Sequence, residues 1–270
     1  MKSVLLYVNQ DEGLEARLQA ALDAVRLFDG HLTCLQVTPF DAFVMADPFG
    51  GVYALPSVLD AVRLGEDEHR GRIEQRLQRE GVSWDWLRVD GRPSQSIIDR
   101  SRLSDLIVLT LPAPPGQDED GPTGLVGDVA VHARAPILAV PRESSGCDLS
   151  GPAIVAWNGS PESAHAIRLA LPILGRSSAV HVVTVTDDET DFPATDACQY
   201  LARHGLRPEL NEWTRKEGSV ADALLDAAAE LRGAFILMGA YGHTRMREAV
   251  LGGVTRSMLR HSNLPLLLAH

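Results

Sequence analysis

Four glycines near the end of the chain have the spacing that most directly suggests a chemical role. Two residues separate Gly239 from Gly242, nine separate Gly242 from Gly252, and Gly253 follows at once. An apolar run before Gly239 predicts a buried strand, and the segment from about Val254 onward predicts a helix. Glycines leave backbone N–H groups unshielded, and the positive end of a helix attracts negative charge. The pattern predicts a cradle for phosphate; the alternative is that the glycines only serve turns that need a positive φ.

Basic side chains in and after this glycine segment are candidates for further contacts with phosphate. They are His243, Arg245, Arg247 and Arg256. Arginine can hold phosphate oxygens through paired hydrogen bonds, so we include Arg245 in the predicted site. The alternative is that these side chains only solvate an exposed loop and helix start, and Glu248 lies close enough in sequence to neutralise Arg245.

The strands and helices that must position the glycines occur twice along the chain. The apolar runs that end at Asn9 and Asn158 each precede an amphipathic segment, as expected for a buried parallel strand that leads into a helix. The predicted helices that follow span 13–28 and 160–174, and the later strands span 31–37, 106–110 and 136–140 in the first half and 179–185, 235–238 and 265–269 in the second. Alternating strands and helices favour parallel sheets with helices on both faces. We therefore predict an α/β fold of two tandem doubly wound parallel-sheet domains, at residues 1–143 and 150–270.

The composition disfavours several classes of protein. The chain has 36 acidic and 25 basic side chains, so a nucleic-acid partner is disfavoured and any anion must be held locally. No apolar run approaches the roughly 20 residues of a membrane span, and the N-terminus lacks the features of a secretory signal. We predict a cytoplasmic protein without membrane contact. Three scattered cysteines argue against a disulfide framework and a zinc site, and His31 and Cys34 should lie on opposite faces of a strand. We predict no catalytic and no metal-ligating side chains.

The repeat and the glycine spacing together resemble a tandem universal stress protein, and the resemblance covers essentially the whole chain. It implies two adenine-nucleotide α-hydrolase-like domains, of which the second binds ATP or another adenine nucleotide, with or without Mg²⁺, at the carboxyl ends of its strands. The implied site consists of Ala156, Asn158, Val185, Met238 and Gly239 around the nucleoside and of Gly242, Gly252, Gly253, Val254 and Thr255 around the phosphates. Domains of this family pair through their last strands, so the resemblance also implies such pairing within this chain, and it leaves a homodimer open.

Two residues depart from the family's pattern. The family usually has an acidic residue where Asn158 stands and a Ser or Thr where Gly253 stands. Asparagine still offers one hydrogen bond to a base or a ribose. Gly253 offers an N–H group without a hydroxyl, so Thr255 is the nearest replacement.

The first half lacks the glycine pattern. If Pro136 stands opposite Pro265, an offset of 129 residues places Thr110, Ala113, Thr123 and Gly124 opposite Gly239, Gly242, Gly252 and Gly253. The intervening segment, 112–122, contains prolines that remove N–H donors and acidic residues that repel an anion. We predict that the first domain does not bind ATP there and has a structural or regulatory role.

Three functions remain open. The chain is predicted to be a nucleotide-binding protein of stress response or signalling that meets an unidentified protein partner. The alternative is an interaction protein that keeps only the fold. The third is slow ATP hydrolysis, for which the glycine loop offers no positioned base apart from Glu248 and His243. Residues 187–189 are a carboxylate run that either recruits a metal or is solvated, and Pro39–Arg79 is either a surface helix or a groove for a ligand or partner.

Overall fold

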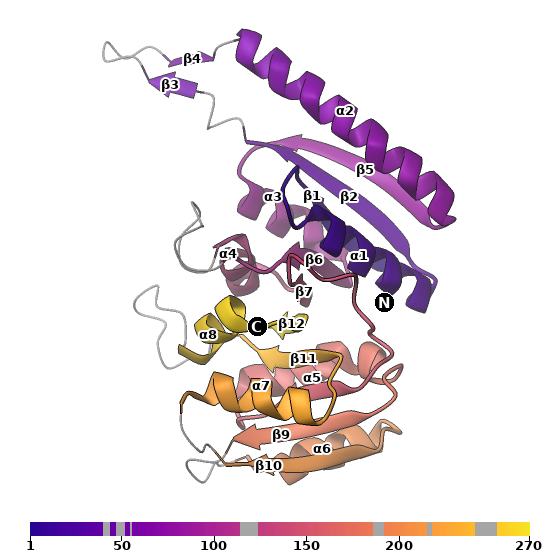
Figure 1. Cartoon of the computed structure of the whole chain (residues 1–270), viewed down its shortest axis with the longest axis vertical. Coiled ribbons are helices and arrows are strands. Elements are labelled where there is room, and N and C mark those ends of the chain that lie inside the picture. The colour runs from indigo at the N-terminus through magenta and orange to yellow at the C-terminus, as the bar shows by residue number, and fades with distance from the viewer. Residues whose placement is uncertain are drawn as a thin grey trace.

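The computed structural model describes residues 1–39, 44–46, 52–54, 56–113, 124–185, 192–214, 218–240 and 253–270. Strands and helices alternate through both halves of the chain (Figure 1). The first half contains β1 (Ser3–Val8), α1 (Leu14–Phe28), β2 (His31–Thr38), β3 (Val44–Ala46), β4 (Val52–Ala54), α2 (Pro56–Glu80), β5 (Ser83–Asp90), α3 (Pro93–Arg100), β6 (Leu106–Thr110), α4 (Gly124–His132) and β7 (Ile137–Val140). The second half contains β8 (Ala153–Ala156), α5 (Pro161–Leu174), β9 (Val180–Val185), α6 (Ala194–Arg203), β10 (Pro208–Trp213), α7 (Val220–Glu230), β11 (Phe235–Gly239), α8 (Gly253–His261) and β12 (Leu266–Ala269).

One ten-stranded sheet runs through the molecule in the order β10-β9-β8-β11-β12-β7-β6-β1-β2-β5. The strands within each half are parallel, whereas β7 and β12 pair antiparallel, with Leu138 opposite Leu267. The two halves therefore join edge to edge through their last strands, as the sequence analysis expected. In each half the strand order reverses beside the first strand, between β1 and β6 and between β8 and β11. In open α/β sheets such a reversal marks the place where ligands bind.

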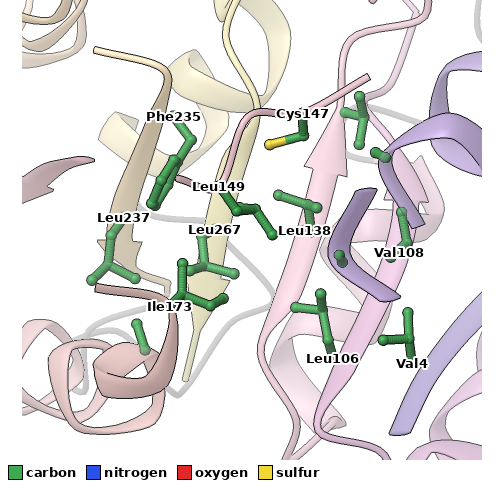
Figure 2. Close-up of a cluster of buried hydrophobic side chains, with 14 of the residues drawn as sticks. Val4, Leu106, Val108, Leu138, Cys147, Leu149, Ile173, Phe235, Leu237 and Leu267 are labelled. Carbon is green, nitrogen blue, oxygen red and sulfur yellow. The ribbon is translucent and has the colours of Figure 1, made fainter. Parts of the chain in front are cut away.

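Helices cover both faces of this sheet and enclose two apolar cores. One core takes side chains from α1, α2, α5 and α6, and the other takes them from α3, α4, α7 and α8. Figure 2 shows that the first core continues across the junction, where Leu138 and Leu149 lie near Leu267. Each fully buried leucine contributes about 2 kcal/mol to folding. The shared core therefore holds the two halves together.

The register of the sequence repeat is confirmed over its last third. At the offset of 129 residues, β6, α4 and β7 match β11, α8 and β12 at both ends of each element. Residues 141–152, between β7 and β8, form turns, and the predicted boundaries at 143 and 150 fall within them. The backbone N–H of Cys147 donates a 3.1 Å hydrogen bond to Asp23 on α1, which fastens this segment to the first half.

The segment between β2 and β5 contains more than the predicted helix. Helix α2 is present and packs Ile73 and Leu77 into the first core, but β3 and β4 pair antiparallel before it and were not predicted. Strands of three residues are too short for a period-two pattern to stand out. Within the described part of the chain, no helix is both long and apolar enough to span a bilayer.

Candidate functional site

A cavity of about 240 Å³ opens at the carboxyl ends of β8, β9 and β11, beside the reversal of strand order in the second half. One part of its lining is apolar and comes from the strand ends and from α7. These residues are Ala156, Trp157, Val185, Val220, Leu224 and Met238. The other part is polar or bare backbone, with Asn158, Ser160 and Glu162 before or in α5, Gly239 at the end of β11, and Gly253, Val254 and Thr255 at the start of α8.

The predicted site residues can now be placed. Ala156, Asn158, Val185, Met238, Gly239, Gly253, Val254 and Thr255 all line this one cavity. Gly242, Arg245 and Gly252 lie outside the described residues, as do His243, Arg247 and Glu248. Arg256, on α8, does not belong to the described lining. The structure thus brings together residues from β8, β9, β11 and α8 that are up to about 100 positions apart in sequence.

The local sequence at the start of α5 explains how Asn158 and Ser160 are positioned. Ser160 caps the helix, because its hydroxyl accepts a 3.1 Å hydrogen bond from the N–H of Ser163, and Pro161 follows at the first helical position. Asn158 in turn accepts a 3.2 Å hydrogen bond from the N–H of Ser160 through Oδ1. The asparagine oxygen therefore holds the turn, and its amide N–H groups are the donors that Asn158 can offer to a ligand.

Gly239 and Gly253 have different roles, and neither is a left-handed turn residue. A Cβ added at Gly239 would lie 2.6 Å from the backbone of Glu162 and Ser163, so only glycine lets β11 approach the first turn of α5 this closely. A Cβ added at Gly253 would meet no atom of the described residues within 4 Å. The start of α8, whose positive end attracts anions, lines the cavity through Gly253, Val254 and Thr255. For these two residues the alternative of simple positive-φ geometry is therefore wrong.

Glu162 is the residue of the lining that the sequence analysis most clearly missed. The only carboxylates considered from the sequence were Glu248 and those of 187–189, whereas the fold brings this one from the first turn of α5. Its side chain lines the cavity although the residue is only 4% exposed. The N-terminal end of α5 favours a negative charge at this position. The cavity therefore combines a carboxylate at α5 with a helix start that attracts anions at α8.

Val220 and Leu224 were also missed, although a weak signal was present. They lie four residues apart on α7, Val220 within and Leu224 after the Ser219–Asp222 capping box that starts this helix. Their spacing places them on one helix face, but only the packing of α7 beside β9 shows that this face borders the cavity.

The equivalent strand ends in the first half are closed by Arg17. Its residue is 1% exposed, and its guanidinium donates hydrogen bonds to the carbonyl oxygens of Tyr7 (2.8 Å) and Asn9 (2.9 Å). It also donates to the hydroxyl of Thr110 (3.0 Å) and, in bidentate fashion, to Asp11 (2.6 and 2.8 Å). Tyr7, Asn9 and Thr110 correspond to Ala156, Asn158 and Gly239 by sheet register. In the first half the buried Arg17 thus joins the ends of β1 and β6. The equivalent strand ends in the second half, those of β8 and β11, border the cavity.

The structure is an α/β fold with a cavity at a reversal of strand order, and comparisons with known proteins agree with this fold. Residues 151–270 match the model of the universal stress protein family. A universal stress protein from Archaeoglobus fulgidus DSM 4304 is 15% identical, with a TM-score of 0.75 over 99% of this chain and 96% of that one. A functionally unknown protein from Pseudomonas aeruginosa PAO1 is 18% identical, with a TM-score of 0.61 over 100% of this chain and 92% of that one.

A putative universal stress protein from Pseudomonas aeruginosa UCBPP-PA14 is also similar, with 17% identity and a TM-score of 0.59 over 99% of this chain and 93% of that one. No curated protein matches the sequence significantly. Residues 151–270 therefore belong to the universal stress protein family, and the whole chain has the fold of universal stress proteins. The predicted resemblance and the predicted α/β fold class are confirmed.

Proposed function

We propose that the second half of the chain binds ATP or a related adenine nucleotide, and that the chain acts as a nucleotide-binding protein in stress response or signalling. The observation that carries this proposal is that eight residues of the site implied by the family resemblance line one cavity. They come from three strand ends and one helix start, which is the arrangement that the family resemblance implies. The first half then has a structural or regulatory role.

The chemistry of the cavity suits the two ends of a nucleotide. Ala156, Val185, Leu224 and Met238 form an apolar slot for a planar base. The start of α8, with backbone N–H groups at Gly253 and beyond, suits phosphate. At about 240 Å³ the cavity is smaller than the typical ligand pocket of roughly 300 to 1,000 Å³, so its described lining suits a base and a sugar, with the phosphates extending past α8.

Local attraction is needed because the chain as a whole is acidic, with a formal net charge of −11. Long-range electrostatics repel a polyanion from such a protein. A helix start and unshielded N–H groups act over short distances, where they outweigh the distant charges that salt screens. Affinity should therefore depend strongly on charge placed at Gly253.

Substitution of Gly253 tests the proposal. Gly253→Asp introduces a carboxylate at a helix start, where a Cβ meets no atom of the described residues within 4 Å and an acidic residue does not disturb folding. We expect wild type to bind a fluorescent ATP analogue saturably and Gly253→Asp to bind it roughly 10-fold or more weakly, since one repulsive charge of about 1.4 kcal/mol changes affinity tenfold. Gly253→Asn, which has nearly the same shape without the charge, is the matched control and should bind nearly as wild type does.

The same titration distinguishes nucleotide binding from the alternative function, that of an interaction protein. A chain that keeps the fold only for interaction with another protein shows no saturable binding by wild type, or equal binding by all three proteins. Either result overturns the proposal, provided that the melting temperatures of the variants are unchanged.

A further inference from the structure

We infer that Glu162 is a specificity-determining residue of this cavity and that its carboxylate binds the paired hydroxyl groups of a ribose. The inference rests on the proposed nucleotide-binding function and goes beyond it, because it states which part of the ligand is selected and by which side chain.

Within the cavity, Glu162 lies between the part that suits a base and the part that suits phosphate. The base slot is bordered by β9 and α7 through Val185 and Leu224, whereas the phosphate end is the start of α8. Glu162 lies in the first turn of α5, and its backbone is close to Gly239 at the end of β11, where the glycine segment begins. In the strand order, β8 and its helix α5 separate β9 from β11. A nucleotide with its base in the apolar part of the cavity and its phosphates at the start of α8 therefore has its ribose next to Glu162.

The chemistry of a carboxylate suits this position. An ionised carboxylate only accepts hydrogen bonds and offers about four lone-pair positions, so contacts within the protein leave capacity for a ligand. A ribose presents two neighbouring hydroxyl donors, and an acidic side chain that binds ribose hydroxyls is a general device in dinucleotide-binding α/β folds. The negative charge of Glu162 also repels phosphate, so it favours the orientation in which the phosphates lie at α8 and not at Glu162.

The first half also has a glutamate at the second position of a helix, Glu15, which borders a different cavity, between α1 and α2. Glu15 is the second residue of α1, as Glu162 is the second residue of α5. The side chain of Glu15 is 75% exposed and forms an ion pair with Arg76 on α2. The helix position therefore does not by itself enclose a glutamate. By sheet register the counterpart of Glu162 is Gly13, and Glu162 is enclosed where the first turn of α5 meets the end of β11 at the cavity.

The test compares ATP with 2′,3′-dideoxy-ATP, which lacks both hydroxyl donors. Affinities are measured by isothermal titration for wild type, Glu162→Gln and Glu15→Gln, each with Mg²⁺ and with excess EDTA. We expect wild type to bind ATP roughly 10-fold or more tightly than the dideoxy nucleotide, the effect of a lost hydrogen bond to a charged group. Glu162→Gln should reduce this ratio several-fold and leave the affinity for the dideoxy nucleotide unchanged or higher, whereas Glu15→Gln should keep the wild-type ratio.

The outcomes are distinguishable. Equal binding of both nucleotides by wild type overturns this inference alone and needs no variant that folds. An equal loss of affinity for both nucleotides in Glu162→Gln shows a structural role and also overturns it. An effect of Glu162→Gln that disappears in EDTA shows that the carboxylate acts through a cation, which overturns the binding of ribose. Absence of saturable binding of either nucleotide by wild type overturns the proposed function together with this inference.

Discussion

Thr110 and Gly239 occupy the same position in the two halves of the chain, where the end of a strand meets the start of a helix. In the first half the glycine of this contact is Gly13, just before α1, because a Cβ there would lie 2.3 Å from Cγ2 of Thr110. In the second half the strand supplies it, because a Cβ at Gly239 would lie 2.6 Å from the backbone of Glu162 and Ser163. Each contact has room for one side chain at most. The glycine of the strand keeps the cavity of the second half free at this point.

Gly239→Ala should therefore destabilise the protein. The added Cβ meets backbone atoms, which cannot rotate away, so β11 or α5 has to shift. Overpacking of this kind costs about 1 to 3 kcal/mol of the free energy of unfolding, measurable by urea denaturation. Gly253→Ala is the control, because its Cβ meets no atom of the described residues within 4 Å, and it should leave stability unchanged or slightly raised. Equal stability of the two variants would contradict the close approach at Gly239.

Arg17→Met should destabilise the first half. Removal of the guanidinium takes one donor from each of the carbonyl oxygens of Tyr7 and Asn9 and the cationic partner from Asp11. Asn9 and Asp11 each keep one backbone donor, the N–H of Asp11 and of Gly13. Because the side chain of Asp11 is 37% exposed, the pair is only partly buried, and we expect a loss of about 1 to 3 kcal/mol in the free energy of unfolding, measured by urea denaturation. Arg102→Met, which removes the exposed ion pair with Asp99, is the control and should cost less than about 1 kcal/mol.

The same variant carries a second prediction about binding. If the side chain of Arg17 alone blocked a nucleotide site at the strand ends of the first half, its removal would open that site. We expect no second site, because the glycine pattern is absent there as well. Titration of any folded Arg17→Met protein should therefore give one nucleotide per chain, and two would show that the first half is a closed copy of the second.

Asp105→Asn should lower stability in a pH-dependent way. Burial raises the pKa of Asp105, but the backbone N–H groups of Lys2 (2.6 Å) and Ser3 (3.0 Å) donate to its carboxylate and bring the pKa below its ordinary value of 3.8. Because the folded pKa is depressed, the contribution is present above the ordinary value and is lost as the pH falls through the folded pKa. The side chain is largely exposed, so we expect a loss of about 1 kcal/mol or less at neutral pH.

Urea denaturation of Asp105→Asn and wild type at a series of pH values checks this. The difference in free energy of unfolding should be constant above about pH 5 and should shrink toward pH 2. Asp29→Asn is the control, since Asp29 is exposed and its left-handed φ of 47° suits asparagine. A difference for Asp105→Asn that stays the same at all pH values would show that the carboxylate charge does not matter.

Local sequence determined most of the elements of this protein. Apolar runs without helical period predicted the buried strands, and Ser160 followed by Pro161 predicted the start of α5. The repeat of the pattern predicted that the two halves share one fold, and the proline pair Pro136 and Pro265 set the correct register between them. These signals lie within a few residues of one another, so they can be read without knowledge of distant contacts.

The tertiary structure alone decided which side chains meet. Glu15 and Glu162 are each the second residue of a helix and each border a cavity, yet the side chain of Glu15 is exposed whereas Glu162 is buried. Arg17 looked like an ordinary helix residue until the ends of β1 and β6 were placed around it. The physical reason is that burial, pairing and cavity formation depend on elements far apart in sequence, which local propensity does not encode.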